Sequence, residues 1–163
     1  MTIPRFYVPG PWTSDRITFP EKASHHAMRV LRMRNGDEAE VFDGEGRTAR
    51  GRTEFSSEGT VLIAESYPEH GRESPLFITL AQAFVSPDKM EWITEKAVEA
   101  GASRIVFFPA ARSVTKLSGD KLTKRLEKLR ATAVSACEQC GRSRIPEIEA
   151  FASAEAMLSG LNA

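Results

Sequence analysis

The sequence predicts an α/β protein with two parts: a small β-barrel over residues 1–71 and the first part of an α/β sheet over residues 72–163. Two observations lead to this prediction. Before residue 68, short strand patterns alternate with turn residues, which is typical of a small barrel. After residue 75, longer apolar runs alternate with helical patterns, which indicates a β–α–β unit. Residues 68–75 between the two parts have the composition of a linker.

The first part is predicted to hold four strands and one helix. The strands are expected over residues 5–8, 38–42, 47–55 and 60–67, with turn residues at 35–37 and a hairpin signal at 43–46. A helix is expected from residue 20 to about residue 33, because Ala23, Ala27, Val30 and Leu31 recur at helical spacing. These elements are short and closely spaced, so the strands should close around a small core.

The second part is predicted to be a β–α–β unit followed by a long helix. Residues 76–85 and 104–109 are nearly continuous apolar runs, as expected of strands buried on both faces. Pro87 suits the first position of a helix, which Gly101 should end. A long amphipathic helix is expected over residues 120–140, then a strand over 147–151 and a short helix over 154–161. Three strands would make only a narrow core.

Composition and charge restrict the function classes. Of 163 residues, 41% are hydrophobic, and 22 basic side chains balance 22 acidic ones, as in an ordinary globular protein. The balance is uneven locally, because between Arg104 and Arg144 ten Lys or Arg face three acidic residues, a net of +7 (10 − 3). No apolar run approaches the roughly 20 residues that span a bilayer, so no membrane partner is expected. Two cysteines are too few for a disulfide framework, so a reducing, cytoplasmic setting is expected.

The most informative segment is residues 138–146, which follows the long basic helix. Glycine allows the helix to end at Gly141 and Pro146 prevents it from restarting, so that Arg142 and Arg144 are expected at the turn, where guanidiniums can bind a phosphate. The basic face of the preceding helix could equally be a solvated surface. Arg112 follows the second apolar strand, where ligands bind in open α/β sheets; an ion pair with Glu95 or Glu99 is the structural alternative.

Other motifs are read as structural. Cys137 and Cys140 lie at a helix C-terminus and lack a second pair, so core packing is expected rather than redox or metal chemistry, and no metal site is predicted. His25 and His26 point about 100° apart on a helix, which favours one packed and one solvated ring over an RNA-facing pair. Trp12 and Trp92 are expected to pack rather than to stack on bases. No glycine-rich nucleotide loop is present, which disfavours a metabolic α/β enzyme that uses phosphorylated small molecules.

The chain resembles a known family, the bacterial 16S ribosomal RNA uridine N3-methyltransferases (ribosomal RNA small subunit methyltransferase E). Each matching piece is short, but their order and spacing cover nearly the whole chain. The matching pieces include Pro4-Arg5-Phe6, His25-His26-Ala27-Met28-Arg29-Val30-Leu31-Arg32, Phe42-Asp43-Gly44, Asp88-Lys89-Met90-Glu91-Trp92, Arg112-Ser113-Val114 and Glu138-Gln139-x-Gly141-Arg142.

The resemblance implies a fold and an activity. It implies a PUA-like barrel joined to a SPOUT-class α/β domain with a trefoil knot, which dimerises and transfers a methyl group from S-adenosylmethionine to N3 of a uridine in 16S rRNA of the small ribosomal subunit. The family's Gly-Pro-Glu-Gly-Gly segment and knotted tail are expected beyond residue 163. The chain is therefore expected to lack cofactor-binding residues and to be inactive alone, and a non-enzymatic RNA-binding module is the alternative function.

The resemblance and the charge pattern together give a set of candidate residues. Arg142 is the first candidate to stabilise negative charge on the uracil and Arg112 the second, with Glu138 orienting either one. Arg142→Ala should lower methylation and leave folding intact. RNA contacts are expected through the barrel residues Arg5, Arg29, Arg32 and Arg34 and through Lys121, Lys124, Lys128 and Arg144.

Overall fold

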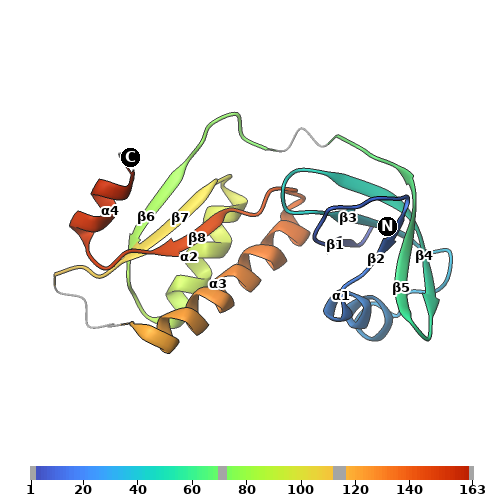
Figure 1. The fold of residues 1–163 in the computed structure, drawn as a ribbon, viewed down its shortest axis with the longest axis horizontal. Coiled ribbons are helices and arrows are strands. Elements are labelled where there is room, and N and C mark those ends of the chain that lie inside the picture. The colour runs from blue at the N-terminus through green and yellow to red at the C-terminus, as the bar shows by residue number, and fades with distance from the viewer. Residues whose placement is uncertain (1–2, 70–72, 112–116, 162–163) are drawn as a thin grey trace. The chain divides into compact units, whose positions relative to one another are not determined.

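A computed structural model of the protein describes residues 3–69, 73–111 and 117–161 (Figure 1). The chain forms two compact units, which are described separately. The first unit comprises Met1–Glu73 together with Gly141–Arg144, and the second comprises Ser74–Cys140 together with Ile145–Ala163. The sequence suggested a single change of domain near residue 72 and gave no sign that residues 141–144 return to the first unit.

The first unit is built on a five-stranded sheet in the order β1-β3-β4-β5-β2. Its strands are β1 (Arg5–Tyr7), β2 (Arg16–Thr18), β3 (Glu38–Phe42), β4 (Thr48–Ser56) and β5 (Gly59–Ser66). The β1–β3 pair is parallel and the other pairs are antiparallel. The predicted strands and the β3–β4 hairpin are confirmed, whereas β2 was missed because three residues are too few to show an alternating pattern.

The sheet closes around one apolar core, as predicted for a barrel. The rings of Phe6, on the first strand in sheet order, and Phe19, directly after the last, lie 5.1 Å apart. Contact between the two ends of the sheet requires the strands between them to curve around a shared interior. The residues of that interior are Phe6, Val8, Ile17, Phe19, Ala27, Ala39, Val41, Ala49 and Leu62.

The predicted helix over residues 20–33 is shorter and wider than expected. It consists of α1 (Glu21–His25) and a π-helical turn, η1 (His26–Val30). The Leu31 amide donates to the His26 carbonyl at 3.0 Å, five residues back, as the π-helix requires. Ala27 is buried in the core, and the His26 ring meets Phe6 edge-on at 5.8 Å while His25 is exposed. The two histidines therefore divide as the structural reading predicted.

The second unit contains a three-stranded parallel sheet in the order β6-β7-β8. Its elements are β6 (Thr79–Ala83), α2 (Pro87–Glu99), β7 (Arg104–Phe108), α3 (Gly119–Cys140), β8 (Glu147–Ala150) and α4 (Ala154–Leu161). Helices α2 and α3 pack against each other (Figure 1). Cys137 is buried and Cys140 half-buried in the last turn of α3, consistent with their expected packing role. The predicted helices and the strands over 104–109 and 147–151 are confirmed.

The prediction of a doubly buried strand over residues 76–85 is wrong. Strand β6 begins only at Thr79 and lies at the edge of the described sheet. Leu76, Phe77 and Ile78 precede it and are 65%, 75% and 41% exposed. The central strand β7 has the predicted burial, because Ile105, Val106 and Phe107 are inaccessible to solvent. Trp92 on α2 also departs from expectation, since it is exposed rather than packed.

Candidate nucleic-acid interface

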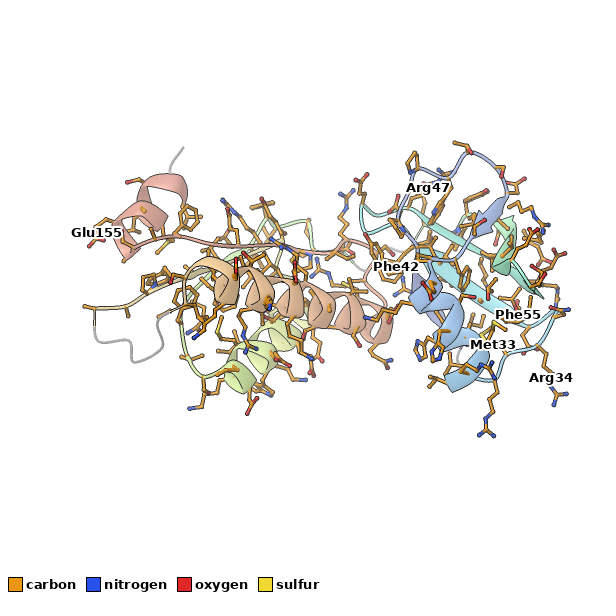
Figure 2. All side chains as sticks on the ribbon, turned by 60° about the horizontal axis from the view of Figure 1, so that its bottom comes forward. Met33, Arg34, Phe42, Arg47, Phe55 and Glu155 are labelled. Carbon is orange, nitrogen blue, oxygen red and sulfur yellow. The ribbon has the colours of Figure 1, made fainter. Side chains whose placement is uncertain are left out.

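The π-helical turn and the loop after it form a surface that combines arginines with exposed apolar side chains. We call it the π-helix surface; it consists of Met28, Arg29, Val30, Leu31, Arg32 and Arg34, all of which are exposed. Figure 2 shows Arg34 extending away from the barrel, beyond Met33 and Phe55. No acidic residue occurs between residues 22 and 36. The side chains of these arginines have no ion-pair or hydrogen-bond partner among the residues that the structure describes.

The backbone beneath this surface is held by side chains. The Arg34 amide donates to Asp37 Oδ2 at 2.7 Å, and the Arg34 carbonyl accepts from Thr53 Oγ1 at 3.2 Å. The next residue, Asn35, accepts a bond from the Phe55 amide at 2.6 Å through Oδ1. Arg32 has a φ of +53°, in the left-handed region that non-glycine residues seldom occupy. A hydrogen-bonded and locally strained backbone thus presents exposed cationic side chains, and strained backbone is common at binding sites.

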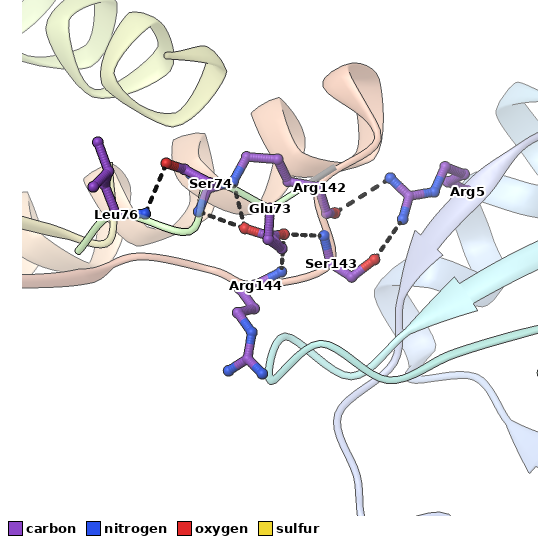
Figure 3. A network of polar contacts seen from close by, with 7 residues as sticks. All are labelled: Arg5, Glu73, Ser74, Leu76, Arg142, Ser143 and Arg144. Atoms are coloured by element: carbon purple, nitrogen blue, oxygen red, sulfur yellow. Dashed lines mark hydrogen bonds and ion pairs between the residues drawn. The ribbon is translucent and has the colours of Figure 1, made fainter. Parts of the chain in front are cut away.

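A second cluster gathers around Glu73, at the end of the barrel segment (Figure 3). Its carboxylate accepts bonds from Arg142 Nε at 3.1 Å and Arg142 Nη2 at 2.9 Å. It also accepts from the backbone amides of Ser143 and Arg144, at 2.8 and 2.9 Å. Arg142 is only 5% exposed. A buried guanidinium of this kind is stable because its charge is paired and its donors are used.

Arg5 extends the same cluster on the barrel side. Its Nε donates to Glu40 Oε1 at 2.6 Å, its Nη1 to the Arg142 carbonyl at 3.2 Å and its Nη2 to Ser143 Oγ at 3.2 Å. Glu40 and Ser143 are buried. The short segment from Gly141 to Arg144 is therefore held in the first unit by the Glu73 carboxylate and by the Arg5 guanidinium. The geometry gives Arg5 a structural role, and its contact with RNA stays a prediction.

The protonation of Glu73 follows from these contacts. Burial favours the neutral acid, but the Arg144 and Ser143 amides and the Arg142 side chain together hold the pKa of Glu73 below its ordinary value of 4.5. Glu73 is therefore a carboxylate at neutral pH. It keeps Arg142 oriented and accepts bonds from Nε and Nη2, at the edge of the guanidinium that would otherwise bind a phosphate.

One expectation about Arg142 needs correction. The sequence placed Arg142 and Arg144 together at an exposed turn, and only Arg144 is exposed there. Arg142→Ala is therefore expected to destabilise the first unit, because it would leave Glu73 without its charge partner in a part-buried site. No local signal marked Glu73, which stands in a segment of linker composition and reaches its partners across about seventy positions of sequence.

The remaining candidates lie in the second unit or outside the described residues. Lys121, Lys124 and Lys128 are exposed on α3, with Lys128 Nζ 3.8 Å from Glu91. Arg125 of the same helix pairs with Glu91 at 3.0 Å, so part of the basic face serves helix packing. Glu138 lies half-buried in the last turn of α3. Arg112 belongs to residues 112–116, outside the described residues, whereas Glu95 and Glu99 both bind Lys96.

In residues 3–69, 73–111 and 117–161, no group of three or more His, Cys, Asp or Glu side chains is arranged to hold a metal ion. Across the same ranges, no helix is both long enough and apolar enough to cross a membrane. The π-helix surface and the Glu73 cluster are both places in the first unit where arginines gather.

Comparison with known proteins matches both parts of the chain. Residues 19–64 match the family model described as an RNA methyltransferase PUA domain, and residues 72–163 match that of an RNA methyltransferase domain. Ribosomal RNA small subunit methyltransferase E of Bacillus subtilis is 34% identical over 126 residues, covering 76% of this chain and 49% of the relative. Its namesake from Mycobacterium tuberculosis is 35% identical over 128 residues, covering 76% and 47%. The chain spans about half the length of these relatives.

Solved structures resemble most of this chain. The Legionella pneumophila protein Lpg2936, in complex with its cofactor SAM, matches with a TM-score of 0.86 at 30% identity, covering 93% of this chain and 64% of that one. Ribosomal RNA small subunit methyltransferase E from Neisseria gonorrhoeae, bound to S-adenosyl methionine, matches with a TM-score of 0.81 at 30% identity, covering 91% and 63%. The predicted architecture, a PUA-like barrel followed by the first part of a SPOUT-class α/β domain, is confirmed.

Proposed function

This chain belongs to the RNA methyltransferase family, and on that premise we propose that the protein transfers a methyl group from S-adenosylmethionine to N3 of a uridine in 16S ribosomal RNA. One observation carries the proposal: the PUA and methyltransferase models match in order along the chain, and the curated relatives are named for the RNA of the small ribosomal subunit. The Neisseria relative, solved with S-adenosyl methionine, supports the choice of methyl donor.

We assign RNA docking by the barrel to the π-helix surface. Its arginines are not neutralised by any carboxylate among the described residues, so their charge is available to phosphates. Met28, Val30 and Leu31 are exposed beside them and offer apolar contact to unstacked bases or sugars. Docking of this kind leaves the second unit to perform the transfer.

The chemistry requires an exposed uracil. N3 lies on the pairing edge and carries a proton, so the base must leave any pair and lose or share that proton before nitrogen can attack the methyl carbon. A fixed guanidinium beside a uracil carbonyl would stabilise the charge that develops there. Arg142 and Arg112 stay candidates for this role, and Glu138 stays the candidate for orienting either of them. Direct contact between Arg142 and the base would require its ion pair with Glu73 to open.

Two glycines of the barrel serve packing within the fold. Gly51 serves close strand pairing, because a Cβ there would lie 1.9 Å from the Ile63 carbonyl oxygen. Gly46, at a φ of +112°, accommodates the Arg144 side chain. That the segment that binds S-adenosylmethionine follows residue 163 stays a prediction.

The test uses small ribosomal subunits from cells that lack the gene for this protein. The full-length gene product is incubated with them and with S-adenosylmethionine labelled with tritium in the methyl group, and the digested nucleosides are identified by mass spectrometry. Label in 3-methyluridine is expected in subunits from the cells that lack the gene. Subunits from cells that have the gene should accept no label, because their target uridine is already methylated. Label only in 5-methyluridine or in ribose methyl groups would overturn the N3 assignment.

The same assay distinguishes the second candidate function, a non-enzymatic RNA-binding module. This alternative is favoured by one observation: the π-helix surface is complete within the first unit. RNA binding by the full-length protein without any methyl transfer would establish it. The 163-residue chain, assayed in parallel, tests the prediction that it is inactive alone, and light scattering of the full-length protein tests the predicted homodimer.

A further inference from the structure

The β3–β4 hairpin carries an exposed arginine that two aromatic rings hold in place. The guanidinium carbon of Arg47 lies 5.3 Å from the centre of the Trp12 ring and 5.2 Å from that of Tyr67. Arg47 Nη1 also donates to the Trp12 carbonyl at 3.2 Å. Contacts with ring faces orient a guanidinium and leave its edge, where the N–H donors lie, for other partners.

The two rings are themselves fixed. Trp12 packs partly against the barrel core, and its Nε1 donates to the Val8 carbonyl at 3.1 Å. Tyr67, just after β5, is 42% exposed, and its hydroxyl donates to Asp15 Oδ1 at 2.5 Å. Arg47 is therefore held by two side chains that are themselves restrained by hydrogen bonds. A preorganised cation loses less conformational entropy on binding an anion than a free one does.

The turn beneath Arg47 is equally constrained. Asp43 Oδ1 accepts from the Glu45 amide at 2.8 Å and from the Arg47 amide at 3.0 Å, and the Asp43 amide donates to the Arg47 carbonyl at 3.1 Å. The carboxylates of Asp43 and Asp15 thus hold the local structure. Glu45 is exposed, and its carboxylate has no partner among the described residues.

A second arginine lies against the same turn. The Gly46 amide donates to the Ser143 carbonyl at 3.1 Å, and Arg144 forms isolated β-bridges with Gly44 and Glu45. A Cβ on Gly46 would lie 3.0 Å from Arg144 Nε and 3.1 Å from its Nη2, so glycine leaves room for that guanidinium over the turn. Arg47 and Arg144, brought from opposite parts of the sequence, therefore flank one glycine.

We propose that Arg47, Arg144 and Tyr67 form a second RNA-contact site of the first unit, which we call the hairpin site. Arg47 and Arg144 would take a phosphodiester group of an unpaired strand, and the exposed Tyr67 ring would stack on a neighbouring base. A purely structural role for Arg47, in which it only stabilises the fold, would explain its contact with Trp12. It would not explain why a second exposed guanidinium lies over the same turn. The inference rests on the proposed function, since it names a further part of the same RNA contact.

The test measures affinity for a fluorescein-labelled, single-stranded oligouridylate of about 12 nucleotides by fluorescence anisotropy, with the same chain at several salt concentrations. Arg47→Ala should weaken binding roughly fivefold to tenfold and reduce the log–log salt slope by about 0.7. Tyr67→Leu should weaken binding roughly threefold with the slope unchanged, because stacking releases no counterions. Arg52→Ala is the matched control, since Arg52 is exposed on the same unit but pairs with Glu65 at 3.2 Å.

Glu45→Gln separates the proposal from a loss of folding. If the hairpin faces phosphate, removing this exposed carboxylate should tighten binding roughly twofold to threefold, which a damaged structure cannot do. Unchanged affinity in both Glu45→Gln and Arg47→Ala would overturn the hairpin site. So would a loss in Arg47→Ala that Arg52→Ala reproduces. Either result leaves the product of the methylation assay unaffected. Label in a nucleoside other than 3-methyluridine would instead overturn the proposed function and leave the measured affinities as they are.

Discussion

Two groups of arginines in the first unit have opposite surroundings. Arg29, Arg32 and Arg34 of the π-helix surface are exposed and have no carboxylate partner among the described residues. Arg142 is buried and held by Glu73, and Arg5 is held by Glu40 at 2.6 Å. Both groups stood out in the sequence for the same reason, which was local positive charge.

The difference shows that basic residues must be sorted by their partners before they are assigned to a ligand. A buried arginine with a carboxylate at hydrogen-bonding distance contributes to the fold, and its removal leaves an unpaired charge. An exposed arginine without such a partner contributes little to the fold and keeps its charge for a phosphate. Four experiments test this distinction.

The largest effect is expected from Arg142→Ala. Loss of the partner of Glu73 should lower the free energy of unfolding of the first unit by about 3 kcal/mol. Denaturant unfolding can be followed by Trp12 fluorescence in a Trp92→Phe background, which reports on the first unit alone. Arg29→Ala is the control and should change the free energy of unfolding by less than about 0.5 kcal/mol. Equal effects of the two substitutions would abolish the distinction.

Acid should reveal the same ion pair in the unmodified protein. Because the pKa of Glu73 is lower in the folded state, its contribution to stability is fully present above the ordinary pKa of 4.5 and is lost as the pH falls through the folded pKa. Unfolding of the first unit, measured between neutral pH and about pH 3, should therefore show a decline below 4.5. Glu73→Gln should start less stable and decline less steeply. Parallel curves for the two proteins would contradict this account.

Affinity for RNA should fall when the exposed arginines of the π-helix surface are substituted. Arg29→Ala and Arg34→Ala should each weaken binding to single-stranded RNA by roughly threefold to tenfold and lower the salt slope by about 0.7, without changing stability. Arg16→Ala serves as the control, because Arg16 is exposed but pairs with Glu54 at 3.0 Å. An equal loss of affinity in the control would mean that only the total charge matters, and the π-helix surface would lose its special role.

The smallest effect concerns the strained backbone at Arg32. Arg32→Gly and Arg32→Ala remove the same charge, so both should weaken RNA binding equally. Glycine tolerates a φ of +53° and alanine does not, so the glycine variant should be the more stable by about 1 kcal/mol in thermal unfolding. If the two variants melt together, the left-handed backbone at this position does not store strain.

What the sequence could reveal depended on how local each feature was. Helix α3, strand β7 and the β3–β4 hairpin were predicted because an apolar stripe, an apolar run or a glycine turn lies within each segment. The apolar run before β6 led to the wrong prediction of a buried strand, because a row of apolar residues does not show whether any neighbour covers it. The π-helical turn was missed because its residues keep an ordinary helical pattern.

The candidate site was predictable only in part. The arginines of the π-helix surface could be named because they cluster in one short segment without acidic residues. The role of Arg142 could not, because its partner Glu73 lies far away in sequence and was assigned to a linker. Arg47 gave no signal for the same reason, since Trp12 and Tyr67 reach it from two other segments. Pairings across long separations set the function of these side chains.

The return of residues 141–144 to the first unit has a consequence for biosynthesis. The donors that satisfy Glu73 come from Arg142, Ser143 and Arg144, so a nascent chain cannot complete this polar cluster until the ribosome has passed residue 144. The N-terminal barrel, although made first, would wait with an unmatched carboxylate through the synthesis of two helices and two strands. A proteolytic or engineered fragment that stops near residue 73 would carry the same defect permanently.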